Sequence, residues 1–279
     1  MQDLVVEFEP HVRLGAFLGV FVLVALWEVV APRRPPQISK AVRWTSNIGI
    51  VVLDTVILRL VFPVAAAGIA AVVGSLGWGL FNALAWPFWL EVVLAVVVLD
   101  LVIYWQHVMF HAVPGLWRLH MVHHADLEFD LTTGVRFHPF EILLSMIIKV
   151  AAIAALGPAP LAVILFEIAL SATSIFNHGN VVMPRALDRF LRLIVVTPDM
   201  HRVHHSVIVN ETNSNFGFNL PWWDRLFGTY RAQPSAGHER MTIGLEQFRE
   251  PRLQWLWHML ALPFTGDGGE YPFGRRRGS

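Results

Sequence analysis

Histidine is the residue type whose number and spacing point most directly to chemistry in this chain. The 279 residues include 13 histidines and no cysteine, which excludes disulfides, thiolate metal ligands and cysteine nucleophiles. Imidazole is the commonest metal ligand among side chains, and it also carries protons near neutral pH. Ten of the histidines fall between residues 107 and 205: His107, His111, His120, His123, His124, His138, His178, His201, His204 and His205.

Three short motifs place these histidines on common helix faces. His107 and His111 are four residues apart, and side chains at this spacing share one helix face with Cβ atoms about 5–6 Å apart. The pattern HxxHH occurs twice, at residues 120–124 and 201–205. Protonated imidazoles packed this densely would repel one another, and neutral ones would need many hydrogen-bond partners. Because a bound cation resolves both problems, the motifs predict a metal site.

The number of imidazoles indicates two metal ions, because one ion takes only about four to six ligands and eight to ten histidines are present. An all-nitrogen shell suits iron, zinc, copper or nickel and argues against calcium or magnesium. Zinc proteases usually carry a glutamate in HExxH, whereas the two HxxHH copies enclose Met121-Val122 and Arg202-Val203. The residues therefore disfavour zinc hydrolysis but do not choose among the metals.

The composition indicates a membrane protein. Hydrophobic residues make up 55% of the chain and charged residues 15%, against roughly 25% charged in an average soluble domain. Lys+Arg and Asp+Glu both total 21, so no net charge would recruit nucleic acid, and no nucleic-acid partner is expected. Apolar runs that could cross a bilayer lie at residues 13–31, 47–73, 88–106 and 140–177.

The loops between these runs suggest how they are arranged. Gly157-Pro158-Ala159-Pro160 should split the 140–177 run into a hairpin of two short spans. Residues 32–46 carry several basic side chains and residues 74–87 carry no charge, and Lys and Arg favour the cytoplasmic side. We therefore expect an all-α, polytopic membrane protein of about four to five transmembrane helices, whose cytoplasmic helical cap carries a dinuclear histidine site. Five crossings with the N-terminus outside agree with this distribution of basic residues. A first apolar segment that enters the membrane and returns to the same side would agree with it equally well.

The chain is expected to have three parts: N-terminal transmembrane helices at 1–87, the histidine-motif region at 88–232, and a C-terminal part at 233–279. Within the last part, residues 252–264 include Trp255, Trp257 and Leu262 and should form a helix lying on the membrane surface. The Arg275-Arg276-Arg277 tail is expected to be a solvated end near lipid headgroups.

Polar residues near the motifs are candidates for supporting the chemistry. Asp100 and Tyr104 lie on the helix stripe of His107 and His111, and polar groups inside spans are costly and often functional. We expect them to line the cavity or to hold a water; an ion pair between Asp100 and Arg59 is the structural alternative.

Further candidates are carboxylate and amide side chains that lie close in sequence to a histidine. Metal-bound imidazoles usually donate their other nitrogen to a carboxylate or carbonyl, and the candidate carboxylates are Asp126, Glu141 and Asp199. Asn177 and Asn180 flank His178 and could hydrogen-bond a metal-bound water. For all of these residues, helix capping or loop hydrogen bonding is the plain alternative. The predicted catalytic set is therefore Asp100, Tyr104, Asn177, Asn180 and Asp199.

The order, spacing and membrane setting of these motifs resemble those of the membrane-bound fatty acid hydroxylase/sterol desaturase superfamily. The resemblance covers about residues 90–232. The Leu-Thr-Thr stretch and Trp223-Asp224-Arg225-Leu226-Phe227-Gly228-Thr229 resemble most the alkylglycerol monooxygenase branch and its bacterial relatives. Other matching stretches are Asp126–Arg136, Arg136-Phe137-His138-Pro139, Asn177-His178-Gly179-Asn180 and Thr197-Pro198-Asp199-Met200-His201.

This resemblance implies a non-haem centre of two iron ions that activates O2 and attacks an unactivated C–H bond of a lipid. The reaction outcomes in the superfamily include hydroxylation, desaturation and ether-lipid cleavage. The histidines of HxxxH and of both HxxHH motifs match its ligand motifs, and His138 and His178 stand where members supply further ligands. Zinc could replace iron in recombinant material.

The resemblance also bears on partners and location. The lipid substrate should enter from the bilayer, and the metal site should lie on the cytoplasmic side of a bacterial inner membrane or of the endoplasmic reticulum. No cytochrome b5-like or ferredoxin-like segment is present in these residues, so electrons should come from a separate protein or a reduced small molecule. Reduced pterin is the donor that the alkylglycerol branch suggests.

Three other classes of protein use clustered histidines. A di-zinc membrane hydrolase acting on a lipid would hold zinc natively and would need neither O2 nor reductant. A haem protein or electron carrier would need isolated histidines at mid-span, whereas these histidines cluster at span ends. A metal transporter would place ligands through the bilayer centre, where only scattered polar residues such as Asp54 and Glu167 occur.

Overall fold

The computed structural model describes residues 2–273, with side chains described from residue 8 onward. The described part of the chain is helical and holds no β-strand beyond two isolated bridges, which confirms the all-α prediction. The helices are α1 (Gln2–Val30), α2 (Lys40–Val61), α3 (Ala66–Ser75), α4 (Phe88–Ala112), α5 (Pro114–His124), α6 (Pro139–Leu156), α7 (Pro160–Asn177), α8 (Arg185–Leu191), α9 (Pro198–His204), α10 (Val209–Thr212), α11 (Trp222–Leu226) and α12 (Leu256–Thr265), with 3-10 turns at Thr133–Val135 and Pro251–Gln254.

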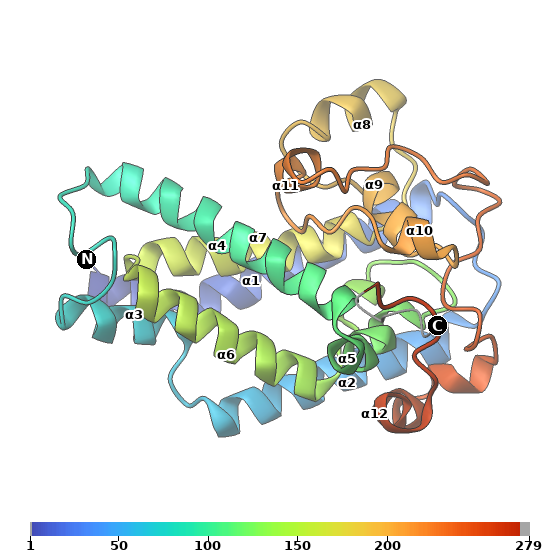
Figure 1. The fold of residues 1–279 in the computed structure, drawn as a ribbon, viewed down its shortest axis with the longest axis horizontal. Coiled ribbons are helices and arrows are strands. Elements are labelled where there is room, and N and C mark those ends of the chain that lie inside the picture. The colour runs from blue at the N-terminus through green and yellow to red at the C-terminus, as the bar shows by residue number, and fades with distance from the viewer. Residues whose placement is uncertain (1, 274–279) are drawn as a thin grey trace, which may run out of the picture.

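Five segments are helical, long and apolar enough to cross a membrane: Phe8–Val30, Lys40–Ser75, Phe88–Ala112, Pro139–Leu156 and Pro160–Asn177. An α-helix satisfies its own backbone hydrogen bonds, which is what a chain needs inside hydrocarbon. The long helices lie along one common direction, with the N-terminus near one end and the short helices α8–α12 at the other (Figure 1). We call the latter the site end. Five candidate spans agree with the higher of the two predicted numbers, four to five.

Two breaks in the apolar runs shape this bundle. The 47–73 run falls within one candidate span, Lys40–Ser75, but the helix is interrupted there, because α2 ends at Val61 and α3 begins at Ala66. Pro63 lies in this gap, and its ring removes a backbone donor and blocks continued helix, so α3 turns and packs on α6 and α7. The predicted break at residues 157–160 is confirmed, because α6 ends at Leu156 and the next residue, Gly157, has a φ of 64°, a conformation that favours glycine.

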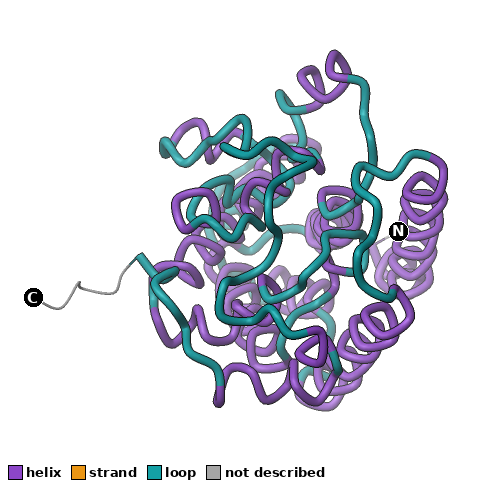
Figure 2. The backbone as a smooth tube through the Cα atoms, turned by 90° about the vertical axis from the view of Figure 1, so that its right-hand side faces the viewer, coloured by secondary structure: helices purple, strands orange, loops and turns teal. Residues whose placement is uncertain are grey.

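The site end is built around a buried core that joins elements distant in sequence. Ile50 of α2, Trp117 and Met121 of α5, and Met259 and Leu262 of α12 belong to one buried cluster. Figure 2 views this end directly and shows loops and short helices crossing over it. The predicted surface helix at 252–264 corresponds to α12 and its preceding 3-10 turn, whereas the Arg275-Arg276-Arg277 tail lies outside the described residues.

The three expected parts of the chain pack closely on one another. Helix α1 lies against α7, and α2 contacts α6 and α12. The boundaries at residues 87/88 and 232/233 stay predictions.

Candidate metal centre

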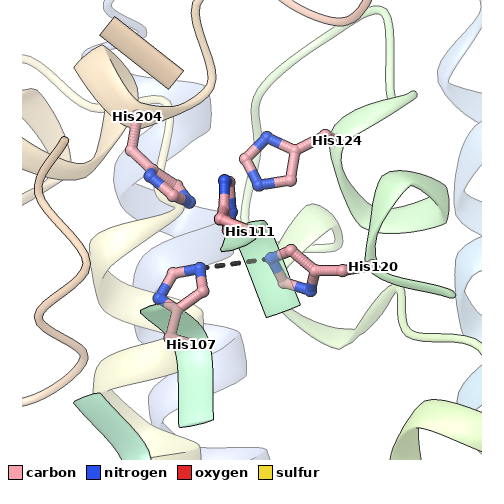
Figure 3. A group of neighbouring side chains, drawn as sticks. All are labelled: His107, His111, His120, His124 and His204. Atoms are coloured by element: carbon pink, nitrogen blue, oxygen red, sulfur yellow. Dashed lines mark hydrogen bonds between the residues drawn. The ribbon is translucent and has the colours of Figure 1, made fainter. Parts of the chain in front are cut away.

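Nine of the ten predicted ligand histidines converge in two buried groups at the site end. Within each group, the candidate ligand nitrogens all lie within 4.8 Å of one another. Figure 3 shows the first group, whose rings come from α4, α5 and α9 and point toward a common centre. The first group consists of His107, His111, His120, His124 and His204, and the second of His123, His178, His201 and His205.

Each HxxHH motif contributes to both groups, because of helix periodicity. Residues four apart share a helix face, whereas adjacent residues point about 100° apart. On α5, His120 and His124 therefore face the first group while His123 faces the second. At α9 the assignment is reversed: His201 and His205 face the second group and His204 faces the first. The two groups thus lie side by side and are linked through both motifs.

In the first group, hydrogen bonds from Nδ1 of two rings, His107 and His204, to backbone carbonyls keep these nitrogens turned away from the centre of the group. Nδ1 of His107 donates to the carbonyl oxygen of Phe216 at 2.8 Å, and Nδ1 of His204 donates to that of Ser214 at 2.8 Å. A carbonyl only accepts, so each of these neutral rings carries its proton on Nδ1 and keeps a lone pair on Nε2. Nε2 of His111, His124 and His204 is buried without a hydrogen-bond partner among the described residues.

The second group is arranged around His178. Its Nδ1 donates to the carbonyl of Ser174 at 2.7 Å, and its Nε2 lies 3.2 Å from Nε2 of both His123 and His205 and 3.1 Å from that of His201. Two nitrogens about 2.1 Å from a shared ion lie about 3.0 Å apart at right angles and about 3.4 Å apart in a tetrahedron. The observed separations therefore fit donors that face one ion.

Burial keeps these imidazoles neutral. Desolvation lowers the pKa of His120 and of His178 to about 3. The pKa values of His123, His124, His201, His204 and His205 are well below their ordinary range, first because of burial and then because neighbouring imidazoles would repel a second positive charge. Neutral imidazole is the form that binds a metal, so the groups are electrostatically prepared for cations.

His138 lies outside both groups. Its Nδ1 accepts the backbone N–H of Phe140 at 3.2 Å, which caps the start of α6, and its Nε2 donates to the carbonyl of Leu260 at 3.2 Å. Both ring nitrogens are therefore engaged with the backbone. His178, the other predicted ligand that lies outside the HxxxH and HxxHH motifs, does belong to the second group.

Asp100 and Tyr104 anchor a C-terminal segment to α4. The Asp100 carboxylate accepts the backbone N–H groups of Asn219 and Leu220 and, at 2.8 Å, the indole N–H of Trp223; the alternative pairing with Arg59 does not occur among the described contacts. The Tyr104 hydroxyl lies 2.9 Å from the hydroxyl of Thr229. Both contacts hold residues 219–229, the segment after α10 that includes α11.

The other predicted catalytic residues also bind protein groups. Asn177 donates to the carbonyl of Phe218, while its Oδ1 is buried without a partner among the described residues. Asn180 exchanges two hydrogen bonds with the backbone of Arg34. The carboxylate of Asp199 pairs with Arg33 and Arg202, and these arginines and His238 hold the pKa of Asp199 below its usual value against the effect of burial.

Of the three carboxylates expected beside ligand imidazoles, Glu141 takes that position: it accepts from Nδ1 of His120 at 2.7 Å. Asp126 instead pairs with buried Arg43, and this guanidinium holds the pKa of Asp126 well below its usual range even though burial acts in the opposite direction. The pair ties α2 to the loop that follows α5.

Sequence reasoning missed the segment that receives the outward nitrogens of three first-group histidines. Asn213, Ser214 and Phe216 accept from His111, His204 and His107, respectively. Asp224 in turn accepts the N–H groups of Phe216 and Gly217 at 2.7 and 2.8 Å. The available sequence signal was the Trp-Asp-Arg-Leu-Phe-Gly-Thr motif that contains Asp224. The acceptors at Ser214 and Phe216 are backbone carbonyls, which have no residue type of their own, and the amide oxygen of Asn213 is far in sequence from His111.

Comparisons with known proteins place this arrangement in a family context. Ornithine lipid hydroxylase OlsE of Rhizobium tropici is 36% identical over 150 residues, which cover 53% of this chain and 44% of that protein. Human alkylglycerol monooxygenase is 31% identical over 147 residues, covering 51% of this chain and 30% of that protein. Rat cholesterol 25-hydroxylase is 25% identical over 171 residues, covering 61% and 55%. The match therefore spans about half or less of the length of these relatives.

No solved structure matches the chain. The expected proximity to the alkylglycerol monooxygenase branch agrees with the relatives found. The family model described as fatty acid hydroxylase matches residues 92–229, the region that contains all nine converging histidines. With its five apolar helices, this integral membrane protein therefore belongs, through residues 92–229, to the fatty acid hydroxylase family.

Proposed function

We propose that the chain is a membrane oxidoreductase that hydroxylates a C–H bond of a lipid at a di-iron centre, using O2 and electrons from a separate donor. The observation that carries this proposal is the pair of adjacent imidazole groups, each buried, neutral and directed inward. Two of the relatives are named as a lipid hydroxylase and a monooxygenase, which favours hydroxylation over desaturation as the outcome.

The donor set fits two iron ions. The first group would hold one ion through five imidazoles and the second group would hold the other through four. Nitrogen donors suit iron, and an ion with up to six ligands keeps positions for oxygen or water. When bound, the iron pair would supply the oxidising power that no side chain has, because a saturated C–H bond offers nothing for an acid or base to hold.

The chain itself orients the ligands and excludes water. Glu141 fixes the ring of His120 from outside, as carboxylates commonly do for metal-bound histidines, and raises the basicity of its Nε2. Phe137 stacks on His123 with ring centroids 4.6 Å apart, and Phe129 packs 5.4 Å from His178. These rings keep the surroundings of the second group apolar, which limits side reactions with water.

The position of the centre supports a lipid substrate that enters from the bilayer. His107 and His111 are on the last turns of α4, so the first group lies where a membrane span ends. Basic residues such as Arg33 and Arg34 follow α1 at the site end, whereas the connections at 76–87 and 157–159 carry no charge. This distribution supports a cytoplasmic location for the centre.

The test is isotopic. Lipids would be extracted from cells that express the parent chain, the His123→Ala variant or no added gene, each grown under ¹⁸O2 or in H2¹⁸O. We expect a lipid that gains one oxygen atom only with the parent chain and carries the label only from O2. A product labelled from water alone would indicate the di-zinc hydrolase, and identical lipids in all three strains would contradict a lipid-modifying role.

A further inference from the structure

An apolar surface on α8, the turn after it and α11 takes no part in the proposed chemistry. Phe190, Leu193 and Leu226 are 60%, 56% and 68% exposed, and Ile194 and Trp222 are also exposed. We call these five residues the apolar ledge. Helix α8 stands out beyond the bundle at the site end, and the view down that end shows the same projection (Figures 1 and 2). Contiguous exposed apolar surface of this kind marks a site of interaction.

The ledge is held together by hydrogen bonds between its two parts. The indole N–H of Trp222 donates to the carbonyl of Leu193 at 2.6 Å, and Arg225 donates to the carbonyl of Arg192 at 3.0 Å. Arg192 also pairs with Asp188 of α8 at 2.8 Å. The bonds from Trp222 and Arg225 join α11 to the turn after α8, and the Arg192–Asp188 pair braces the end of α8, so the apolar side chains are presented on a fixed frame.

The ledge continues the lipid-facing surface of a membrane span. Phe227, which follows Leu226, lies with its ring centroid 4.8 Å from that of Trp105. Trp105 and Met109 are exposed on α4, which is one of the five candidate spans. The contact of Trp105 with Phe227 thus joins the flank of α4 to the residue that follows Leu226 of the ledge, and aromatic rings such as Trp105 favour the level of the lipid headgroups.

Basic side chains border the ledge. Arg185 and Arg189 of α8 are exposed, as is Arg225 of α11, while the nearby acidic side chain Asp188 is already paired with Arg192. An apolar face bordered by arginines is the pattern of elements that lie in the plane of a membrane and meet phosphate groups.

We propose that α8 and α11 rest on the bilayer surface beside α4, with the ledge at the boundary of headgroups and acyl chains and the arginines at lipid phosphates. The occupant of this surface is therefore phospholipid. This proposal concerns how the site end sits on the membrane and stands independently of the metal chemistry. It would add α8 and α11 to the surface contact that the sequence predicts for α12, on a different flank of the site end.

The absence of cysteine makes a direct test possible, because a single introduced cysteine can be labelled without background. The full chain would carry Phe190→Cys or Leu226→Cys, labelled with a fluorophore whose emission shifts to the blue in apolar surroundings. Ile208→Cys is the matched control, because Ile208 is also an exposed apolar residue of the site end, at 42%, but precedes α10 away from the ledge. The proteins would be placed in vesicles of phosphatidylcholine and phosphatidylglycerol.

We expect lipids with a nitroxide on the acyl chain to quench the labels at 190 and 226 at least about threefold more than the label at 208, and aqueous iodide to show the opposite order. Labels at 190 and 226 that respond like the control would overturn the proposal. Protection from both quenchers would also overturn it, since the ledge would then be covered by protein, either a second copy or another partner. Leu193→Cys replaces any variant whose thermal unfolding in detergent differs from that of the parent chain.

Discussion

The carboxylate of Glu141 and the imidazole of His120 are joined by a 2.7 Å hydrogen bond although they come from different helices, α6 and α5. The opposite nitrogen of the same ring, Nε2, lies 3.1 Å from Nε2 of His107 on α4. One imidazole of α5 thus faces groups from both α4 and α6 at the end of the membrane spans. Because its Nδ1 is fixed by Glu141, its Nε2 is directed at the centre of the first group.

Replacing Glu141 by alanine should weaken metal binding in the first group. Outer hydrogen bonds of this kind commonly change metal affinity by about 10–100-fold. Glu141→Gln is the matched control, because its amide oxygen can still accept from Nδ1 of His120 and the loss should be smaller. Metal retention would be measured by elemental analysis after titration with a chelator. Equal retention in parent and Glu141→Ala would show that this carboxylate does not support a ligand.

The division of each HxxHH motif between two groups gives a second prediction. His123→Ala removes a donor of the second group and His124→Ala removes one of the first, so each should lower the metal content from about two ions per chain toward about one. His138→Ala is the control. It should keep both ions and lose only about 1 kcal/mol of stability with its helix cap.

Metal content per purified chain measures all three of these variants. A fall with His138→Ala as large as that with His123→Ala would restore His138 as a ligand and contradict the grouping seen here.

The sequence predicted much of this protein for identifiable reasons. Apolar runs and the Gly157 break report directly on bilayer crossing, and histidine spacing reports on a shared helix face. Helix periodicity predicts that His123 and His124 point in different directions. Which histidines of α9 each of them meets depends on the orientation of α5 relative to α9, which the sequence does not give. The roles of His138 and Asp100 could not be predicted, since both bind backbone groups of segments distant in sequence.

Acid should destabilise the fold through His238, which is outside the metal groups. Burial lowers its pKa from 6.5 to about 4, so between these values the unfolded chain binds a proton that the folded chain does not. The free energy of unfolding therefore falls as the pH drops from about 6.5 toward 4, by up to about 2 kcal/mol at pH 5.

His238→Gln removes this titration and is the matched variant. Thermal unfolding in detergent at pH 7 and pH 5 should show the parent losing more stability than the variant on acidification. A parent and variant that lose stability equally would mean that His238 is protonated in the folded protein as readily as in the unfolded chain.

Asp100 gives a prediction that separates an anchoring role from a catalytic one. Its carboxylate accepts three hydrogen bonds from the segment 219–223, and Asn at this position would lose at least one acceptor and place an N–H against a donor. We expect Asp100→Asn to lower the free energy of unfolding by about 1–3 kcal/mol. Trp223→Phe removes only the indole donor and should cost less.

Thermal unfolding and limited proteolysis of the segment 219–232 would measure the effect, with metal content as the independent readout. If Asp100 is an anchor, the loss of activity in Asp100→Asn should follow the loss of folded protein and should be partly matched by Trp223→Phe. An Asp100→Asn protein with unchanged melting and unchanged metal content but no activity would instead assign the carboxylate to the reaction, because three satisfied backbone and indole donors could not explain that result.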